Sequence, residues 1–188
     1  DPGYTMQWRK GGFYRARLGI ESGSQTILDI ISKKITIAQI KASLKSLASA
    51  GIKTTTYWIA GHPGETEADF QKTLDLLEEL QDYIFEAECD PFRFFYMGQV
   101  NADVWNNKSL LYPEDKTGML LTQTWVLNEE PQREIIYERA CRFKEHCKKL
   151  GIPNPYSVSE IHEADARWKQ LHINAVPPLL ELNHCTAD

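Results

Sequence analysis

Apolar residues in the first hundred positions recur with two periods, one typical of strands and one typical of helices. Stretches that alternate, or that are rich in β-branched and aromatic residues, are predicted to be strands: 13–20, 52–60, 84–89 and 92–96. Stretches whose apolar residues recur every three to four positions are predicted to be helices: 25–32, 36–50 and 65–80. Strands and helices therefore alternate, which predicts an α/β fold with a parallel sheet and right-handed crossovers.

Particular residues mark the expected ends of these helices. Thr36 and Gln39 have the spacing of a capping box, and Gly51 stands where a left-handed helix stop is expected. The next helix is expected to begin near Glu65, since acidic side chains suit a helix N-terminus.

The pattern changes after residue 98. Residues 99–131 are irregular and predict a long connection. A helix with Pro131 in its first turn follows, and then a helix opened by a capping box of Ser157 and Glu160. The chain is thus divided into an α/β part, an irregular connection, a helical extension and a tail: 1–98, 99–131, 132–174 and 175–188.

Length and charge bear on the class of protein. The 188 residues carry a formal net charge of −5, so the chain lacks the basic surface of a nucleic-acid binder. No apolar run approaches the roughly 18 residues of a membrane span, and no secretory signal opens the sequence. We therefore expect a cytoplasmic protein with neither a nucleic-acid partner nor a membrane span. A complete eight-stranded βα barrel takes about 250 residues, more than this chain has.

Polar turns follow the first two predicted strands, at the edge where parallel sheets bind ligands. In the first turn, the carboxylate of Glu21 and the hydroxyl of Ser22 could bind a sugar diol or an amino-acid headgroup. In the second, Gly61 and Gly64 flank a helix N-terminus, where a phosphate or carboxylate could dock. A purely structural role in reversing the chain and capping a helix is the alternative for both turns. His62 has no Ser, Cys or carboxylate partner nearby in sequence, so a catalytic role is not favoured.

The third predicted strand and the cysteines are less informative about a ligand or metal site. Glu86, Glu88 and Asp90 share one face of that strand and could line a polar barrel interior or lie at a solvated rim. The four cysteines have no C-x-x-C spacing, so we expect buried free thiols rather than a metal site or disulfides: Cys89, Cys141, Cys147 and Cys185.

Taken together, the two turns resemble the radical SAM superfamily. The resemblance rests on RLGIESGSQ at 17–25 and AGIKTTTYWIAGHPGETEADFQKTLDLL at 50–77, and it covers about residues 11–98. It is strongest to the branch that carries a cobalamin-binding domain ahead of the radical SAM core. The stretch 123–157 is similar, less specifically, to the C-terminal extension of that branch.

The resemblance implies a fold and a cofactor. The fold would be the C-terminal half of a partial βα (TIM-like) barrel, its fourth to sixth strands, followed by the α-helical extension. S-adenosylmethionine would bind at the strand ends, with Glu21 and Ser22 at the ribose and with Ile59, Gly61 and Gly64 in the turn that flanks the adenine.

Several further expectations follow from the same resemblance. Residues 89–92 would form a looser contact with the cofactor, and Arg17 could reach a carboxylate. The opening segment 1–10 would start partway into the third helical segment of the barrel.

One departure from the family concerns its iron–sulfur cluster. The family holds a 4Fe–4S cluster through C-x-x-x-C-x-x-C, and this sequence has no such triplet. We therefore expect the missing N-terminal half of the same protein to supply the cluster and cobalamin, and the chain alone to be inactive. The substrate would be a small-molecule or peptide-like organic compound, and methyl transfer, cyclisation and rearrangement all stay open. The alternatives are a degenerate homologue that binds without catalysing and a non-catalytic α/β module whose helices dock a protein partner.

Overall fold

The computed structural model describes residues 1–95, 124–125, 129–154 and 158–175. Its helices are α1 (Pro2–Lys10), α2 (Gln25–Ile30), α3 (Ile37–Ser49), α4 (Glu67–Glu79), the short 3₁₀ helix η1 (Gln81–Tyr83), α5 (Arg133–Lys149) and α6 (Val158–Leu171). Its strands are β1 (Arg15–Glu21), β2 (Lys53–Ala60), β3 (Glu86–Pro91), β4 (Phe94–Phe95) and β5 (Thr124–Trp125).

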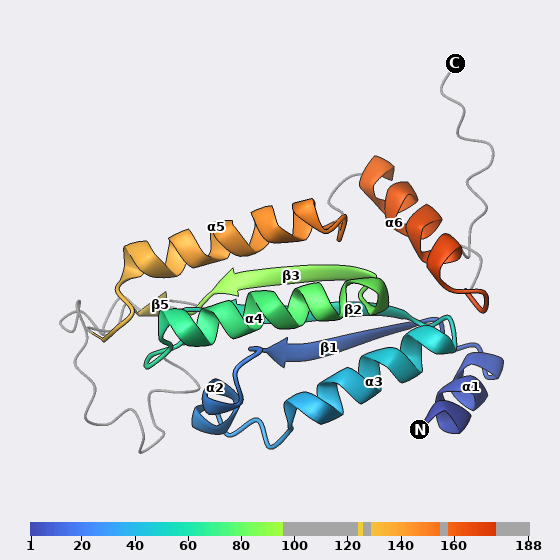
Figure 1. Cartoon of the computed structure of the whole chain (residues 1–188), viewed down its shortest axis with the longest axis horizontal. Coiled ribbons are helices and arrows are strands. Elements are labelled where there is room, and N and C mark those ends of the chain that lie inside the picture. The colour runs from blue at the N-terminus through green and yellow to red at the C-terminus, as the bar shows by residue number, and fades with distance from the viewer. Residues whose placement is uncertain (96–123, 126–128, 155–157, 176–188) are drawn as a thin grey trace.

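β1, β2 and β3 form a parallel sheet with β2 in the centre. Arg17 lies opposite Thr55, and Thr55 lies opposite Glu86, so the three strands are in register. α3 connects β1 to β2, and α4 connects β2 to β3 (Figure 1). This arrangement confirms the predicted α/β fold, an open parallel sheet consistent with part of a TIM-like barrel. β4 and β5 form a separate antiparallel pair.

The face of the sheet that meets the helices is apolar. Trp58 of β2 is buried against Phe143 of α5, with ring centroids 5.6 Å apart. The same core contains residues from the sheet and from α2, α3 and α4: Ile20, Leu28, Leu44, Phe70 and Leu77. Because alternate residues of a strand point to opposite faces, the remaining strand residues lie on the other face.

That other face is polar and internally bonded. Glu86 is only 2% exposed, and its Oε1 accepts a 2.6 Å hydrogen bond from the Thr55 hydroxyl. Arg15 pairs with the same carboxylate and donates to Thr55 over 2.8 Å. The carboxylate predicted to lie in a polar interior or at a solvated rim therefore belongs to a buried ion-pair network. This fits the polar interior.

The helix caps test which residues were correctly predicted to mark the ends of helices. Thr36 and Gln39 form both hydrogen bonds of the predicted capping box, and Gly51 has φ 76°. α4 begins at Glu67, two residues after Glu65, because Thr66 caps the helix in a capping box with Asp69.

Of the predicted starts of the last two helices, one is wrong and the other is not tested. Pro131 does not occupy the first turn of α5, since Gln132 is the N-cap and the helix begins at Arg133. Ser157, predicted to cap the last helix, lies outside the described residues.

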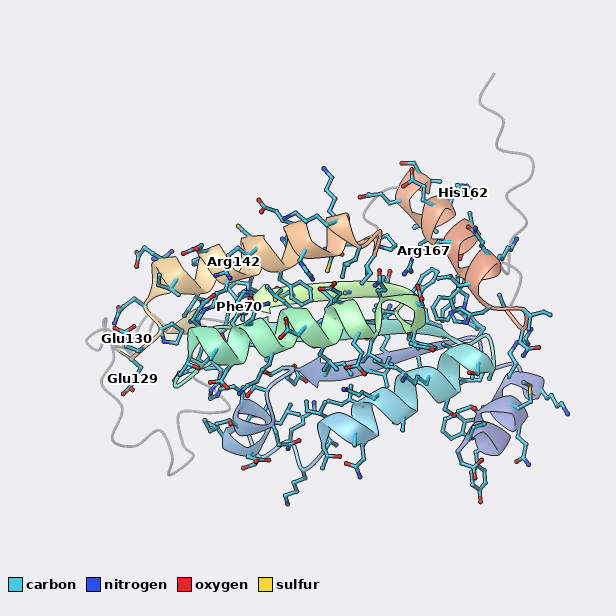
Figure 2. The ribbon with its side chains drawn as sticks, in the orientation of Figure 1. Phe70, Glu129, Glu130, Arg142, His162 and Arg167 are labelled. Carbon is cyan, nitrogen blue, oxygen red and sulfur yellow. The ribbon has the colours of Figure 1, made fainter. Side chains whose placement is uncertain are left out.

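α6 covers the amino ends of the strands, away from the predicted site (Figure 1). Trp168 is buried edge-on against Phe85, with ring centroids 5.7 Å apart. Arg167 donates a 2.8 Å hydrogen bond to the carbonyl of Ile84 (Figure 2). Lys53, at the start of β2, pairs with Asp165. The helical extension thus packs on the α/β part.

Only two of the cysteines in the described part of the chain fit the expected burial. Cys89 and Cys147 are buried, whereas Cys141 is exposed on α5 because it lies off the apolar stripe of that helix. Cys185 lies outside the described residues. Burial raises the pKa of the Cys147 thiol to about 12 and raises that of Cys89 further. Among the described residues, no helix has the length and apolar character needed to cross a membrane.

Candidate functional site

A cavity of about 290 Å³ opens at the carboxyl ends of β1, β2 and β3. It is lined by residues from all three strand ends and from the segment after β3: Glu21, Tyr57, Trp58, Ile59, Asp90, Pro91, Phe92 and Arg93. Two of the five predicted site residues, Glu21 and Ile59, therefore line one cavity. A larger cavity of about 600 Å³ lies between α5 and α6 and contains none of the five. The position at the strand ends favours the smaller cavity as the candidate site.

The local backbone gives Glu21 an unusual conformation. Its φ is 66°, in the left-handed region, and the register with β2 shifts between Gly19 and Glu21. Its Oε1 accepts a 2.6 Å hydrogen bond from the ammonium of Lys33, and its side chain is 19% exposed. A Cβ on Gly19 would lie 2.3 Å from that oxygen, so a side chain there would displace the carboxylate from its present position. Irregular, strained backbone of this kind is concentrated at functional sites, where it redirects a side chain.

Ser22, by contrast, supports the turn by contacting α4. Its buried hydroxyl accepts from the N–H of Ser24 over 3.1 Å and contacts the Thr73 hydroxyl at 3.3 Å. Gly23 donates to the same Thr73 hydroxyl over 2.9 Å. A Cβ on Gly23 would lie 2.4 Å from the carbonyl oxygen of Lys72. The first turn is therefore held directly against α4, and the side chain of Ser22 does not line the cavity.

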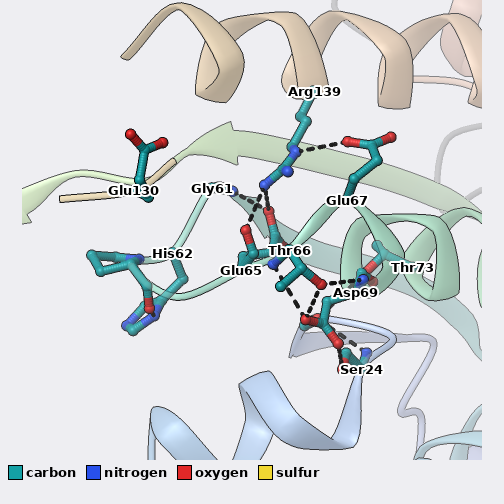
Figure 3. A network of polar contacts seen from close by, with 12 residues as sticks. Ser24, Gly61, His62, Glu65, Thr66, Glu67, Asp69, Thr73, Glu130 and Arg139 are labelled. Atoms are coloured by element: carbon teal, nitrogen blue, oxygen red, sulfur yellow. Dashed lines mark hydrogen bonds and ion pairs between the residues drawn. The ribbon is translucent and has the colours of Figure 1, made fainter. Parts of the chain in front are cut away.

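Asp69 connects the first turn to the cap of α4 (Figure 3). Its carboxylate accepts hydrogen bonds from the hydroxyls of Ser24 and Thr66, both 2.6 Å long, and from Lys72 over 3.0 Å. Burial alone raises the pKa of Asp69, but these hydrogen bonds outweigh burial and hold it well below its ordinary value. Asp69 was identified from sequence only as a helix-start residue. The spacing Thr66-x-x-Asp69 was the signal that could have revealed the capping box.

The second turn is held together by its own backbone and by Glu65. Gly61 has φ 80° and donates a 2.7 Å hydrogen bond to Oε2 of Glu65 (Figure 3). Gly64 has φ 90°, and its N–H donates to the carbonyl of Glu130 over 2.9 Å. The N–H of Glu65 donates to the carbonyl of His62. All three amides are bonded within the chain, so they are not free to hold a phosphate or carboxylate. Neither Gly61 nor Gly64 lines the cavity.

His62 contributes to the cavity indirectly. Its ring packs edge-on against Phe92, with centroids 4.9 Å apart, and its Nδ1 lies 2.9 Å from the carbonyl of Pro63. Phe92 lines the cavity and donates its N–H to the carbonyl of Ala60 over 2.8 Å. His62 therefore supports a wall of the cavity through its contact with Phe92.

The lining combines charged side chains, among them Glu21, Asp90 and Arg93, with apolar and aromatic ones. Glu21 can accept hydrogen bonds from vicinal hydroxyls, and Ile59 and Phe92 offer apolar surface to a planar ring. Within the part of the chain that the structure describes, no three His, Cys, Asp or Glu side chains gather to hold a metal ion. The residues at the strand ends thus fit a nucleoside moiety.

Residues 4–77 match the family model of the radical SAM superfamily. The match includes both strand-end turns and supports the radical SAM superfamily for this part of the chain, as the two motifs predicted. The names of the similar proteins reported below do not mention cobalamin, so the cobalamin-binding branch stays a prediction.

Three curated relatives share one name, tRNA-2-methylthio-N(6)-dimethylallyladenosine synthase. The protein from Solibacter usitatus (strain Ellin6076) is 29% identical over 158 residues, which are 80% of this chain and 31% of the relative. The one from Chloroflexus aurantiacus is 38% identical over 65 residues, 34% of this chain and 14% of the relative. The one from Pseudomonas savastanoi pv. phaseolicola is 38% identical over 77 residues, 39% of this chain and 17% of the relative. The chain therefore spans less than a third of the length of these relatives.

Proposed function

We propose that this chain is part of a radical SAM enzyme and binds the adenosine moiety of S-adenosylmethionine in the strand-end cavity. The observation that carries the proposal is Glu21, whose left-handed backbone at the end of β1 places a carboxylate in the wall of that cavity. In this role Glu21 accepts hydrogen bonds from the ribose hydroxyls. Ile59 and Phe92 contact the adenine and exclude water from it. Ser22 supports the turn that carries Glu21.

The 4Fe–4S cluster of such an enzyme would be held by another part of the same protein. This sequence has no C-x-x-x-C-x-x-C, and Cys89 and Cys147 are buried with raised pKa values, which disfavours the thiolate that binds iron. When bound, the cluster supplies the electron that cleaves the cofactor. The residues of this chain bind and orient the nucleoside end.

The finer features of the reaction are also proposals. The relatives' names describe a methylthio group on a tRNA adenosine, which favours group transfer over cyclisation or rearrangement. Those names also point to a tRNA substrate. The net charge of −5 led us to expect no nucleic-acid partner, and the resemblance implied a small-molecule or peptide-like substrate. Retention of radiolabelled tRNA by the intact protein decides between the two substrates. A requirement for cobalamin rests on the motifs alone.

The variant Glu21→Ala tests the cofactor assignment in the intact protein with its cluster reconstituted. Losing a charge-assisted hydrogen bond costs about 1.5–3 kcal/mol, so the dissociation constant for S-adenosylmethionine should rise roughly 10- to 150-fold. Isothermal titration calorimetry measures this directly.

Lys33→Met is the matched control for that experiment. It removes the partner of Glu21 and leaves the carboxylate in place. We expect its affinity to stay within a few-fold of the parent. If Glu21→Ala binds S-adenosylmethionine as tightly as the parent, the ribose assignment is wrong.

A further inference from the structure

Helix α5 and the residues just before it hold the second strand-end turn at three points. The carbonyl of Glu130 accepts from the N–H of Gly64 over 2.9 Å. Ile136 packs onto the backbone of Gly61, since a Cβ there would lie 2.4 Å from Cγ1 of Ile136. Arg139 donates through Nη1 to both the carbonyl and Oε2 of Glu65, each over 3.0 Å (Figure 3). The turn between β2 and α4 is therefore held in place by a helix far along the chain, since Arg139 lies 74 positions after Glu65.

Arg139 makes the most deeply buried of these contacts. Its side chain is 5% exposed and that of Glu65 is 1% exposed. Among the described residues, Oε1 of Glu65 has no hydrogen-bond partner, so Oε2 carries the bonds from both Gly61 and Arg139. Burial raises the pKa of Glu65, although the bonds from Gly61 and Arg139 act against it. Removing one partner of a buried pair leaves an uncompensated charge, so the position of Glu65 depends on Arg139.

This ion pair connects with the wall of the candidate site. Arg139 fixes the Glu65 carboxylate, and that carboxylate accepts from Gly61, the residue directly after β2. The next residue, His62, packs against Phe92, which lines the cavity together with Ile59. A shift of the turn would therefore move both apolar surfaces assigned to the adenine.

We propose that Arg139 is a positioning residue for the cofactor site, acting through Glu65 and the N–H of Gly61. The inference rests on the proposed function, since it assigns the adenine to the surface formed by Ile59 and Phe92. It makes the C-terminal extension a structural part of the cofactor site. Arg139 itself does not touch the ligand.

The test compares variants of two arginines on α5, in the intact protein with its cluster reconstituted. Arg139→Met removes the donors to Glu65 and should raise the dissociation constant for S-adenosylmethionine about tenfold or more. Arg142→Met is the matched control, since Arg142 pairs with the exposed Glu67 and lies over Phe70 without contacting the turn (Figure 2). Its affinity should stay within about twofold of the parent.

A rescue variant separates positioning from simple loss of stability. In Glu65→Gln/Arg139→Met, the amide oxygen still accepts from Gly61 and no charge is buried alone. We expect this protein to recover most of the affinity. Hydrogen exchange at Gly61, followed by mass spectrometry, should be faster in Arg139→Met and close to the parent in the double variant. Should Arg139→Met fail to fold, Arg139→Lys replaces it, because lysine keeps the charge but supplies fewer fixed donors.

The outcomes distinguish the two proposals. A folded Arg139 variant with unchanged affinity and unchanged exchange at Gly61 overturns the inference and leaves the proposed function standing. A folded double variant that binds as weakly as Arg139→Met also overturns it. Arg139 would then not affect cofactor affinity through the hydrogen bond between Gly61 and Glu65. A parent protein that does not bind S-adenosylmethionine, or a Glu21→Ala variant that binds as well as the parent, overturns the proposed function and the inference with it.

Discussion

At the scale of single residues, side chains predicted to bind a ligand and side chains that support them are interleaved in the same turns. Glu21 lines the cavity, while its neighbour Ser22 is buried against Thr73. Sequence shows both as polar residues at a strand end. Only the backbone distinguishes them, because the left-handed φ of Glu21 directs the two side chains differently.

Asp69 stabilises this arrangement in a pH-dependent way. Because its pKa in the folded protein is below the ordinary 3.8, its contribution is present above that pH and is lost as the pH falls below it. Asp69→Asn should therefore lower the free energy of unfolding at pH 7 by about 1–3 kcal/mol, and this difference should shrink under acid conditions. Urea unfolding between about pH 7 and pH 3 measures both effects.

Asp75→Asn is the control for that measurement. Asp75 is exposed on the same helix and accepts a 2.8 Å hydrogen bond from Gln71. We expect a change within about 0.5 kcal/mol at every pH. Equal pH dependence of the Asp69→Asn variant and the parent would contradict the role given to Asp69.

At the scale of elements, local signals predicted the fold better than the site. The β-branched and aromatic composition of 52–60 and the Thr36–Gln39 box are local features, so β2 and the start of α3 could be found from sequence. The partners of the turns come from far along the chain. Thr73 lies 50 positions after Gly23, and Arg139 lies 74 after Glu65, so sequence periodicity gives no sign of either contact.

α6 offers a test at this scale, because Trp168 is a large and fully buried side chain of this helix. Trp168 is 1% exposed, packs against Phe85 and donates through Nε1 to the carbonyl of Gly51 over 3.3 Å. Trp168→Ala should cost about 3–5 kcal/mol, and the amides of α6 should exchange faster while those of β1, β2 and β3 stay protected. Hydrogen exchange with mass spectrometry on this chain resolves the two regions.

The matched control lies on the exposed side of the same helix. Ile161 is 44% exposed, so Ile161→Ala should change stability by no more than about 0.5 kcal/mol. Equal loss of protection in α6 and in the sheet of the Trp168→Ala variant would mean that the extension and the α/β part unfold together. The extension would then be a part of one cooperative unit.

At the scale of the whole molecule, the proposed cofactor site would be divided between this chain and another segment of the same protein. The chain supplies an open three-stranded sheet whose strand ends form the candidate nucleoside site. Its helix α5 holds one of the two turns at that site through Arg139. Binding of the nucleoside and reduction of the cofactor would therefore depend on different segments of one protein.

The cysteines make this division testable. Cluster assembly needs several thiolates close together, but Cys89 and Cys147 are buried with raised pKa values, while Cys141 is exposed on α5. We expect this chain, incubated anaerobically with iron and sulfide, to show no stoichiometric visible iron–sulfur absorption and no paramagnetic signal on reduction. Cys141→Ser controls for iron bound loosely at the exposed thiol, because colour due to that thiol should disappear in that variant. One reducible 4Fe–4S cluster per chain would show that this chain supplies the ligands, and the proposal that another segment holds the cluster would then be wrong.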